Sequence, residues 1–124
     1  MHDPSDPQSK RDAARRTTLE VARGMLDGSI SLIEGCRSLV RLRFDVEIPA
    51  SETLNVFVGV ESETDEYPVG IQRSEYAPEL LARLDAEVAI YLNGVRPAIA
   101  EACREIIREI EKEQLRSCNT DVIQ

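Results

Sequence analysis

The residues best suited to chemistry lie in one acidic stretch, VESETDEYPVGIQR, which runs from Val60 to Arg73. Its carboxylates fall close together in the chain, at Glu61, Glu63, Asp65 and Glu66. Like charges at such short spacing repel one another unless water, a cation or a partner separates them. Arg73 alone cannot balance them, so the stretch is a candidate contact site for something positively charged.

Two kinds of ligand site are consistent with this stretch. The first is a surface for a basic protein partner, to which Glu61, Glu63 and Glu66 contribute. The second is a small-molecule or cation site in which carboxylates act with Arg73 and Tyr76, either as general acid and base or as oxygen ligands of a hard cation. The carboxylates of this second site are Glu61, Glu63 or Asp65.

A third interpretation gives the stretch no ligand at all. Ser62, Asp65, Pro68 and Gly70 are typical of turns and caps, where such residues satisfy the local backbone. Asp65 and Arg73 would then form a buried, mutually bonded pair, and removing one partner would lower stability rather than function.

Motifs of better-known chemistries are missing from the sequence. The single histidine is His2, so there is no Ser/His/Asp or Cys/His arrangement, no HExxH and no zinc-ligand set. Neither GxxxxGK[ST] nor GxGxxG occurs. We therefore predict no catalytic residue, no metal centre and no cofactor, and we favour a protein that is not an enzyme.

The overall charge indicates which partners to expect. The formal net charge is −8 with a pI near 4.7, which argues against nucleic acid and anionic membranes as partners. Residues 51–80 hold one basic and seven acidic side chains, so most of the excess acid lies around the stretch described above. A basic protein is the partner that this distribution favours.

Cysteine usage and hydropathy indicate a cytoplasmic protein. Cys36, Cys103 and Cys118 are widely spaced and odd in number, and the chain shows neither a secretory leader nor an apolar run of the roughly 20 residues that a membrane helix needs. Cys36 and Cys103 fall on apolar stripes and are predicted to be core residues. Cys118 is the thiol we expect to react.

The hydrophobic periodicity predicts an all-α fold, a bundle of about four to five helices with an irregular acidic loop in the middle. A chain of 124 residues fits one domain. We expect a disordered tail over residues 1–9, one helical domain over 10–116 and a frayed end over 117–124.

Helix signals place the elements within this domain. The first helix runs from Lys10 to Asp27. Ser29 or Ser31 caps a second helix, with Ile30, Ile33, Cys36, Val40 and Phe44 as its apolar stripe. Lys10, Arg11, Arg15 and Arg16 form a basic cluster that is either solvated or held near acid elsewhere.

Two later segments remain ambiguous. Residues 52–60 alternate like a strand at Val56, Val58 and Val60, yet a strand would lack a good partner, so we favour a short helix. A long helix begins at Pro78, and it is either kinked at Pro97 or broken there into two.

The segment ESETDEYPVG, with Arg73 and the helix after it, resembles a family of short bacterial proteins that carry a SETD…PVG segment followed by an arginine. The resemblance covers roughly residues 21–110. It implies an all-helical fold and a bacterial source, but no activity, because none is assigned to the family. Tyr76 stands where related sequences place Trp, and Pro97 is a second departure.

Together these features predict a small acidic binding protein. Its most concrete form is an immunity protein that neutralises a basic toxin, and a homodimer that completes the core is a further expectation. The alternative is the small-molecule or cation site of residues 61–66 with Arg73. Neither the partner nor the ligand can be identified from the sequence.

Overall fold

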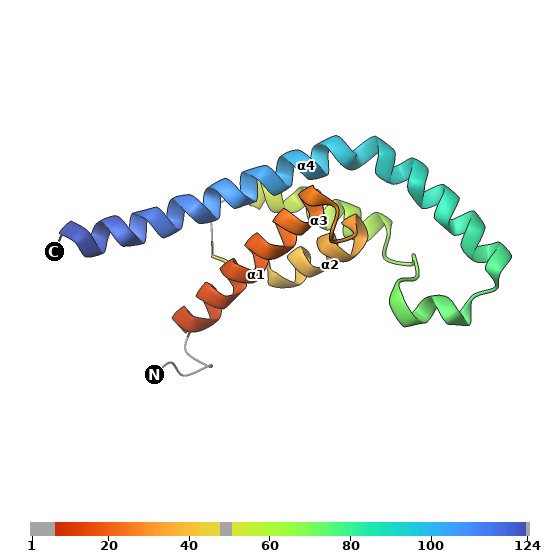
Figure 1. Ribbon diagram of the computed structural model, residues 1–124, viewed down its shortest axis with the longest axis horizontal. Helices are drawn as coiled ribbons and strands as arrows, with labels where there is room; N and C mark the ends of the chain where they lie inside the picture. The colour runs from red at the N-terminus through yellow and green to blue at the C-terminus, as the bar shows by residue number, and fades with distance from the viewer. Residues whose placement is uncertain (1–6, 48–50, 124) are drawn as a thin grey trace.

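The computed structural model describes residues 7–47 and 51–123, with Ser51 and residues 117–123 described by their backbone alone. Its elements are α1 (Pro7–Asp27), α2 (Leu32–Leu42), α3 (Ser51–Glu63), the 3-10 helix η1 (Gly70–Glu75) and α4 (Pro78–Ile123). The described residues contain no strand, so the predicted all-α fold is confirmed. Figure 1 shows α4 as a long arch, with α1, α2 and α3 packed beneath its middle part.

The start of α1 differs from the prediction. The helix begins at Pro7 rather than Lys10, so residues 7–9 of the expected disordered tail are helical. Proline suits the first helical position because it lacks an N–H that would have no partner there. The rest of that expected tail, residues 1–6, lies outside the described residues.

The start of α2 is one of the two predicted positions, Ser31 rather than Ser29, but its end differs from the prediction. Ser31 caps the helix, since its hydroxyl accepts a hydrogen bond from the Glu34 backbone N–H at 3.1 Å. The helix ends at Leu42, and the chain then turns, so the helical period no longer applies to Phe44. Phe44 is 77% exposed, which makes its assignment to the core wrong, and Val46 is buried instead.

Residues 51–63 form the helix α3, so the helical interpretation is confirmed over the strand. The helix runs three residues further than predicted and therefore includes Glu61 and Glu63. Phe57 and Val60 point from α3 into the core, where both are nearly fully buried.

The last helix, α4, is continuous through Pro97 and extends to Ile123. Figure 1 shows that it bends in its cyan to light-blue part, which includes Pro97. Such a bend is expected, because proline removes one hydrogen bond from the helix interior. The backbone stays helical over the end that we expected to fray, while the side chain of Cys118 lies outside the described ones.

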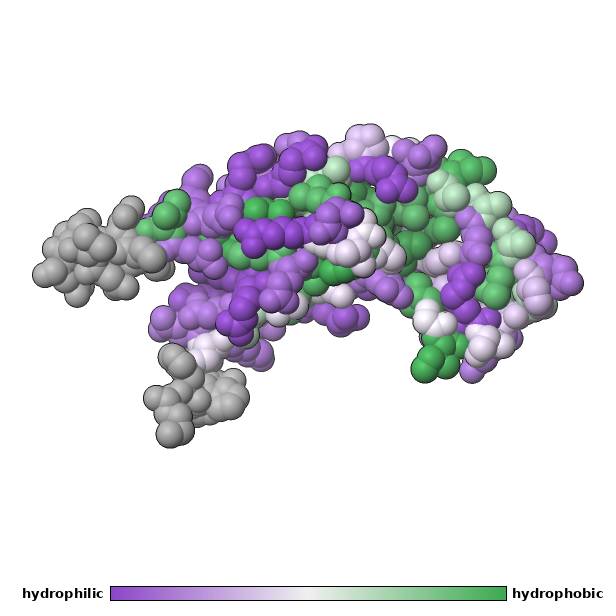
Figure 2. Space-filling model, viewed as in Figure 1, coloured by the Kyte–Doolittle hydropathy of each residue, from purple (hydrophilic) through white to green (hydrophobic). Residues whose placement is uncertain are grey.

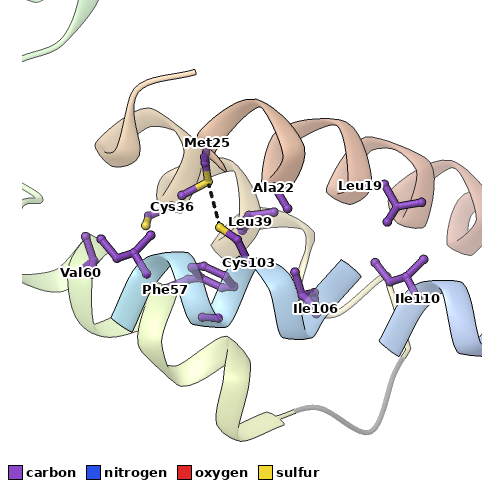
Figure 3. Packing of buried hydrophobic residues seen from close by; sticks show 12 residues of the cluster. Leu19, Ala22, Met25, Cys36, Leu39, Phe57, Val60, Cys103, Ile106 and Ile110 are labelled. Carbon is purple, nitrogen blue, oxygen red and sulfur yellow. Dashed lines mark hydrogen bonds between the residues drawn. The ribbon is translucent and has the colours of Figure 1, made fainter. Parts of the chain in front are cut away.

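One aliphatic core joins the four α-helices (Figure 3). Cys36 of α2 and Cys103 of α4 are fully buried in it, as predicted, and the sulfur of Cys103 lies 4.0 Å from that of Met25 in α1. Burial raises the pKa of the Cys36 thiol to about 12 and that of Cys103 to about 11. Both thiols therefore stay protonated and behave as small apolar groups.

Part of the basic cluster of α1 is structural rather than solvated. Arg15 is only 8% exposed, and its guanidinium donates to the backbone carbonyls of Val46 and Glu47, at 2.6 Å each. Arg11 lies 3.9 Å from the carboxylate of Glu47, so one acid is close to the cluster. These hydrogen bonds hold the turn that follows α2 against α1.

No helix among the described residues is both long enough and apolar enough to span a bilayer.

Candidate binding cleft

The segment between α3 and α4, residues 64–77, is called the arm here. Its first part is fixed to the helical body by Arg37 of α2, whose guanidinium donates to the carbonyls of Thr64 (2.6 Å) and Tyr67 (2.9 Å). The Thr64 hydroxyl in turn donates to the carbonyl of Val60 at 2.7 Å, and Pro68 is fully buried. Turn chemistry therefore positions this part, as the third interpretation expects for Pro68.

The second part of the arm is held to α4 by Arg73, and its partner is Asp85 rather than Asp65. The guanidinium donates to both carboxylate oxygens of Asp85, at 3.0 and 2.8 Å. It also donates to the Tyr67 hydroxyl at 3.1 Å, and that hydroxyl donates to Asp85 at 2.5 Å. The buried pair of Asp65 and Arg73 that would favour the third interpretation is not found, because Asp65 is exposed and Arg73 is only half-buried.

The charges in this cluster stabilise one another. The pKa of the Asp85 carboxyl is lowered, mainly by the hydrogen bond from Arg73 and to a smaller extent by that from Tyr67. Burial and the bond to Asp85 together raise the pKa of the Tyr67 phenol. Arg73 is thus neutralised locally by Asp85 and cannot compensate the carboxylates of residues 61–66.

An open cleft of about 770 Å³ lies between the arm and the first half of α4. It is lined by Glu63, Thr64, Asp65, Glu66, Tyr67, Gln72, Tyr76, Leu80, Leu84, Glu87, Val88 and Tyr91. Four of these residues carry carboxylates and none is Lys or Arg. Figure 2 shows apolar side chains continuing along the inner side of the arched α4, from the helical body towards the arm. The cleft therefore combines an acidic rim with an apolar floor.

Tyr91 of α4 and Glu63 of α3 line this cleft together. Burial is the main cause that raises the pKa of the Tyr91 phenol, and the negative charge of Glu63 raises that pKa further. The phenol therefore stays neutral and adds no charge to the acidic rim.

A smaller hollow of about 260 Å³ lies on the other side of Tyr67. Its lining is mostly apolar and comes from the start of α2, the arm and α4: Ser31, Leu32, Ile33, Glu34, Tyr67, Pro68, Val69, Gly70, Arg73, Val88 and Leu92. Tyr67 and Val88 line both hollows, so they form the partition between them.

The structure brings together most of the site residues predicted from the sequence, but not all. Glu63, Asp65, Glu66 and Tyr76 line the cleft. Glu61 does not line it, and Arg73 lines the smaller hollow instead. The cluster proposed for a small-molecule site is therefore divided, because Arg73 lies on the far side of Tyr67 from the acidic rim.

Sequence reasoning missed Asp85, Glu87 and Tyr67. Asp85 and Glu87 lie beside the apolar stripe Leu81, Leu84 and Val88 of α4. Acids at the edge of such a stripe are the signal that could have identified them. Tyr67 lies within the acidic stretch, but its role depends on Arg73 and Asp85, which only the fold brings to its hydroxyl.

No group of three or more His, Cys, Asp and Glu residues in the described part of the chain is arranged to hold a metal ion. Comparison with protein-family models, with curated proteins and with solved structures gives no match. The resemblance to the SETD…PVG family therefore stays a prediction, and function must be argued from the cleft itself.

Proposed function

We propose that this protein is a non-enzymatic binding protein whose cleft receives a basic segment of a partner protein. The observation that carries the proposal is the lining of the cleft, in which four carboxylates surround an apolar floor and no Lys or Arg is present. Such a surface favours a ligand that brings both positive charge and apolar area.

The electrostatics support a cationic ligand. The carboxylates of Glu63, Asp65, Glu66 and Glu87 share one open space, and the guanidinium of Arg73, beyond Tyr67, is already paired with Asp85. A Lys or Arg side chain in the cleft would relieve the repulsion among these acids. Its arrival would also be accelerated by their combined field.

The floor of the cleft supports a protein ligand rather than a bare ion. Leu80, Leu84 and Val88 are half-buried and line the space beside three tyrosines. Long basic side chains lay their methylene groups on such surfaces while the charged head reaches acid or water. Tyrosine is also enriched where proteins bind one another.

The alternative, a small-molecule or cation site, has less support from the geometry. It requires Arg73 beside the carboxylates of residues 61–66, but Arg73 lies on the far side of Tyr67 and binds Asp85. An immunity protein that blocks a basic toxin is the most concrete form of the favoured proposal. A toxin gene next to that of this protein would support this form.

A titration with a defined peptide tests the proposal. The probe is a short fluorescent peptide of alternating arginine and leucine, compared with one in which glutamate replaces arginine. We expect binding of the arginine peptide only, with affinity that falls as salt is raised from about 20 to about 200 mM. Equal binding of both peptides, or affinity indifferent to salt, contradicts the proposal.

A matched pair of variants locates the binding surface. The cleft variant carries Glu63→Gln, Asp65→Asn, Glu66→Gln and Glu87→Gln. The control carries Glu101→Gln, Glu105→Gln, Glu109→Gln and Glu113→Gln, which removes equal charge from the other half of α4. We expect the cleft variant to bind the arginine peptide at least about tenfold more weakly and the control to change binding by about twofold at most. Equal losses would mean that net charge, not the cleft, attracts the peptide.

A further inference from the structure

The 3-10 helix η1 is attached to the rest of the chain far more weakly than the start of the arm. None of its residues is buried, and Ile71 is 90% exposed. The bonds of the other η1 residues are internal, such as that from the Ser74 hydroxyl to the Ile71 carbonyl at 2.8 Å. Among the described residues, Arg73 alone carries hydrogen bonds from η1 to other parts of the protein.

The two ends of η1 allow it to move. Gly70 begins it with a φ of +60°, a conformation that only glycine adopts without strain, and a Cβ added there would meet nothing within 4 Å. At the other end Tyr76 is extended, and α4 starts at Pro78. In contrast, residues 64–68 are fixed by Arg37 and by the buried Pro68.

The position of η1 links it to both hollows. Gly70 and Arg73 belong to the wall of the smaller hollow, while Gln72 belongs to the wall of the cleft. The two hollows meet at Tyr67 and Val88, and the Tyr67 hydroxyl is held by Arg73 and Asp85. Release of Arg73 would therefore free η1 and at the same time remove one of the two hydrogen bonds that hold the Tyr67 hydroxyl.

We propose that η1 is a hinged flap, tethered by Arg73 to Asp85, and that its opening joins the two hollows into one groove above Val88. This inference rests on the proposed function in one respect, since the flap then controls how much apolar floor a bound segment reaches. Segments with few buried contacts open most readily, which is the property that a flap requires.

Thiol labelling measures the opening directly. Val88→Cys is introduced into the full chain with Cys118→Ser, which leaves only the buried thiols of Cys36 and Cys103 besides the new one. We expect Arg73→Gln and Asp85→Asn each to accelerate maleimide labelling of the introduced thiol about tenfold, because each removes a bidentate, charge-assisted pair. The control Arg104→Gln breaks an exposed pair with Glu101 on the same helix and should leave the labelling rate unchanged.

Hydrogen exchange gives an independent measurement without any cysteine at position 88. In Arg73→Gln, the amides of residues 70–76 should exchange about tenfold faster, while those of α1, α2 and α3 keep their wild-type rates. Unchanged rates at residues 70–76, or an equal acceleration throughout the molecule, would overturn the flap. Neither measurement involves a partner, so a failure of peptide binding and a failure of the flap are distinguishable.

Discussion

The two halves of α4 carry the same apolar pattern but differ in what covers it. In the second half, Ile99, Cys103, Ile106 and Ile110 are at most 1% exposed, because α1 and α3 pack against this part of α4. In the first half, the stripe continues through Leu80, Leu84 and Val88, which stay half-buried and line hollows. One continuous helix thus supports a packed core at one end and an open cleft at the other.

This difference shows where stability and binding are located. Burial of apolar side chains supplies most of the free energy of folding, and here it is concentrated beneath the second half of α4. The first half has apolar surface left over, together with the acids of the arm. Because the packed half supplies the stability, the apolar surface of the cleft can stay open to a partner.

The largest contrast is expected from truncating one apolar side chain in each region. Phe57→Ala removes a fully buried ring and should lower the free energy of unfolding by about 3–5 kcal/mol. Leu84→Ala removes a half-buried side chain and should cost only about 1 kcal/mol. Urea unfolding monitored by circular dichroism measures both. Similar losses would mean that the first half of α4 is as well packed as the second.

Helix positions could be predicted from the sequence because their signals are local. The cap at Ser31, the proline at position 78 and the apolar stripes lie within a few residues of the structure they specify. Cys36 and Cys103 were assigned to the core by the same periodicity, and both are buried. Phe44 was misplaced because its pattern extended past the end of the helix.

The partner of Arg73 could not be predicted, because it depends on the path of the chain. Asp65 and Asp85 lie at comparable distances from Arg73 in sequence, and only the turn of the arm onto α4 selects Asp85. The cleft has the same origin, since Glu63 and Glu87 meet across it from different helices. The acidity of residues 61–66 could be predicted from the sequence. The apolar floor of the cleft could not, because α4 supplies it and only the fold brings α4 beside the arm.

The core thiols should make the stability of the packed region depend on pH in the alkaline range. Their pKa values are raised to about 12 and about 11, so the protonated forms are favoured in the folded state. Their contribution is fully present below the unfolded pKa, about 8.5, and is lost as pH rises towards the folded values. Unfolding free energy should fall by up to about 1.4 kcal/mol per pH unit for each thiol.

Urea unfolding at about pH 8, 8.5 and 9 in a Cys118→Ser background checks this slope below the pH at which Tyr67 and Tyr91, whose pKa values are also raised, begin to titrate. The double variant Cys36→Ala with Cys103→Ala is the control, since it removes both titrating groups and should flatten the profile. A slope that persists in the control would assign the effect to other groups.

Adding one methyl group should have opposite effects in the two regions. At Gly35 of α2, a Cβ would lie 2.5 Å from Cγ of Met25, inside the packed core. Gly35→Ala should therefore cost about 1–3 kcal/mol by overpacking, despite the better helix propensity of alanine. In a Met25→Ala background, which makes room for the added methyl group, Gly35→Ala should cost much less stability than it does in the wild-type chain. Full additivity of the two losses would contradict a collision at this site.

At Gly94 of α4 the same substitution should raise stability slightly. A Cβ there would meet nothing within 4 Å, and the position lies inside the helix. Gly94→Ala should stabilise the protein by about 0.5–1 kcal/mol, as should Gly59→Ala in α3, where the surroundings are equally open. Both are measured by thermal unfolding at several protein concentrations. A loss at Gly94 that grows with protein concentration would show that a second copy contacts this face, because a methyl group harms only a surface that something covers.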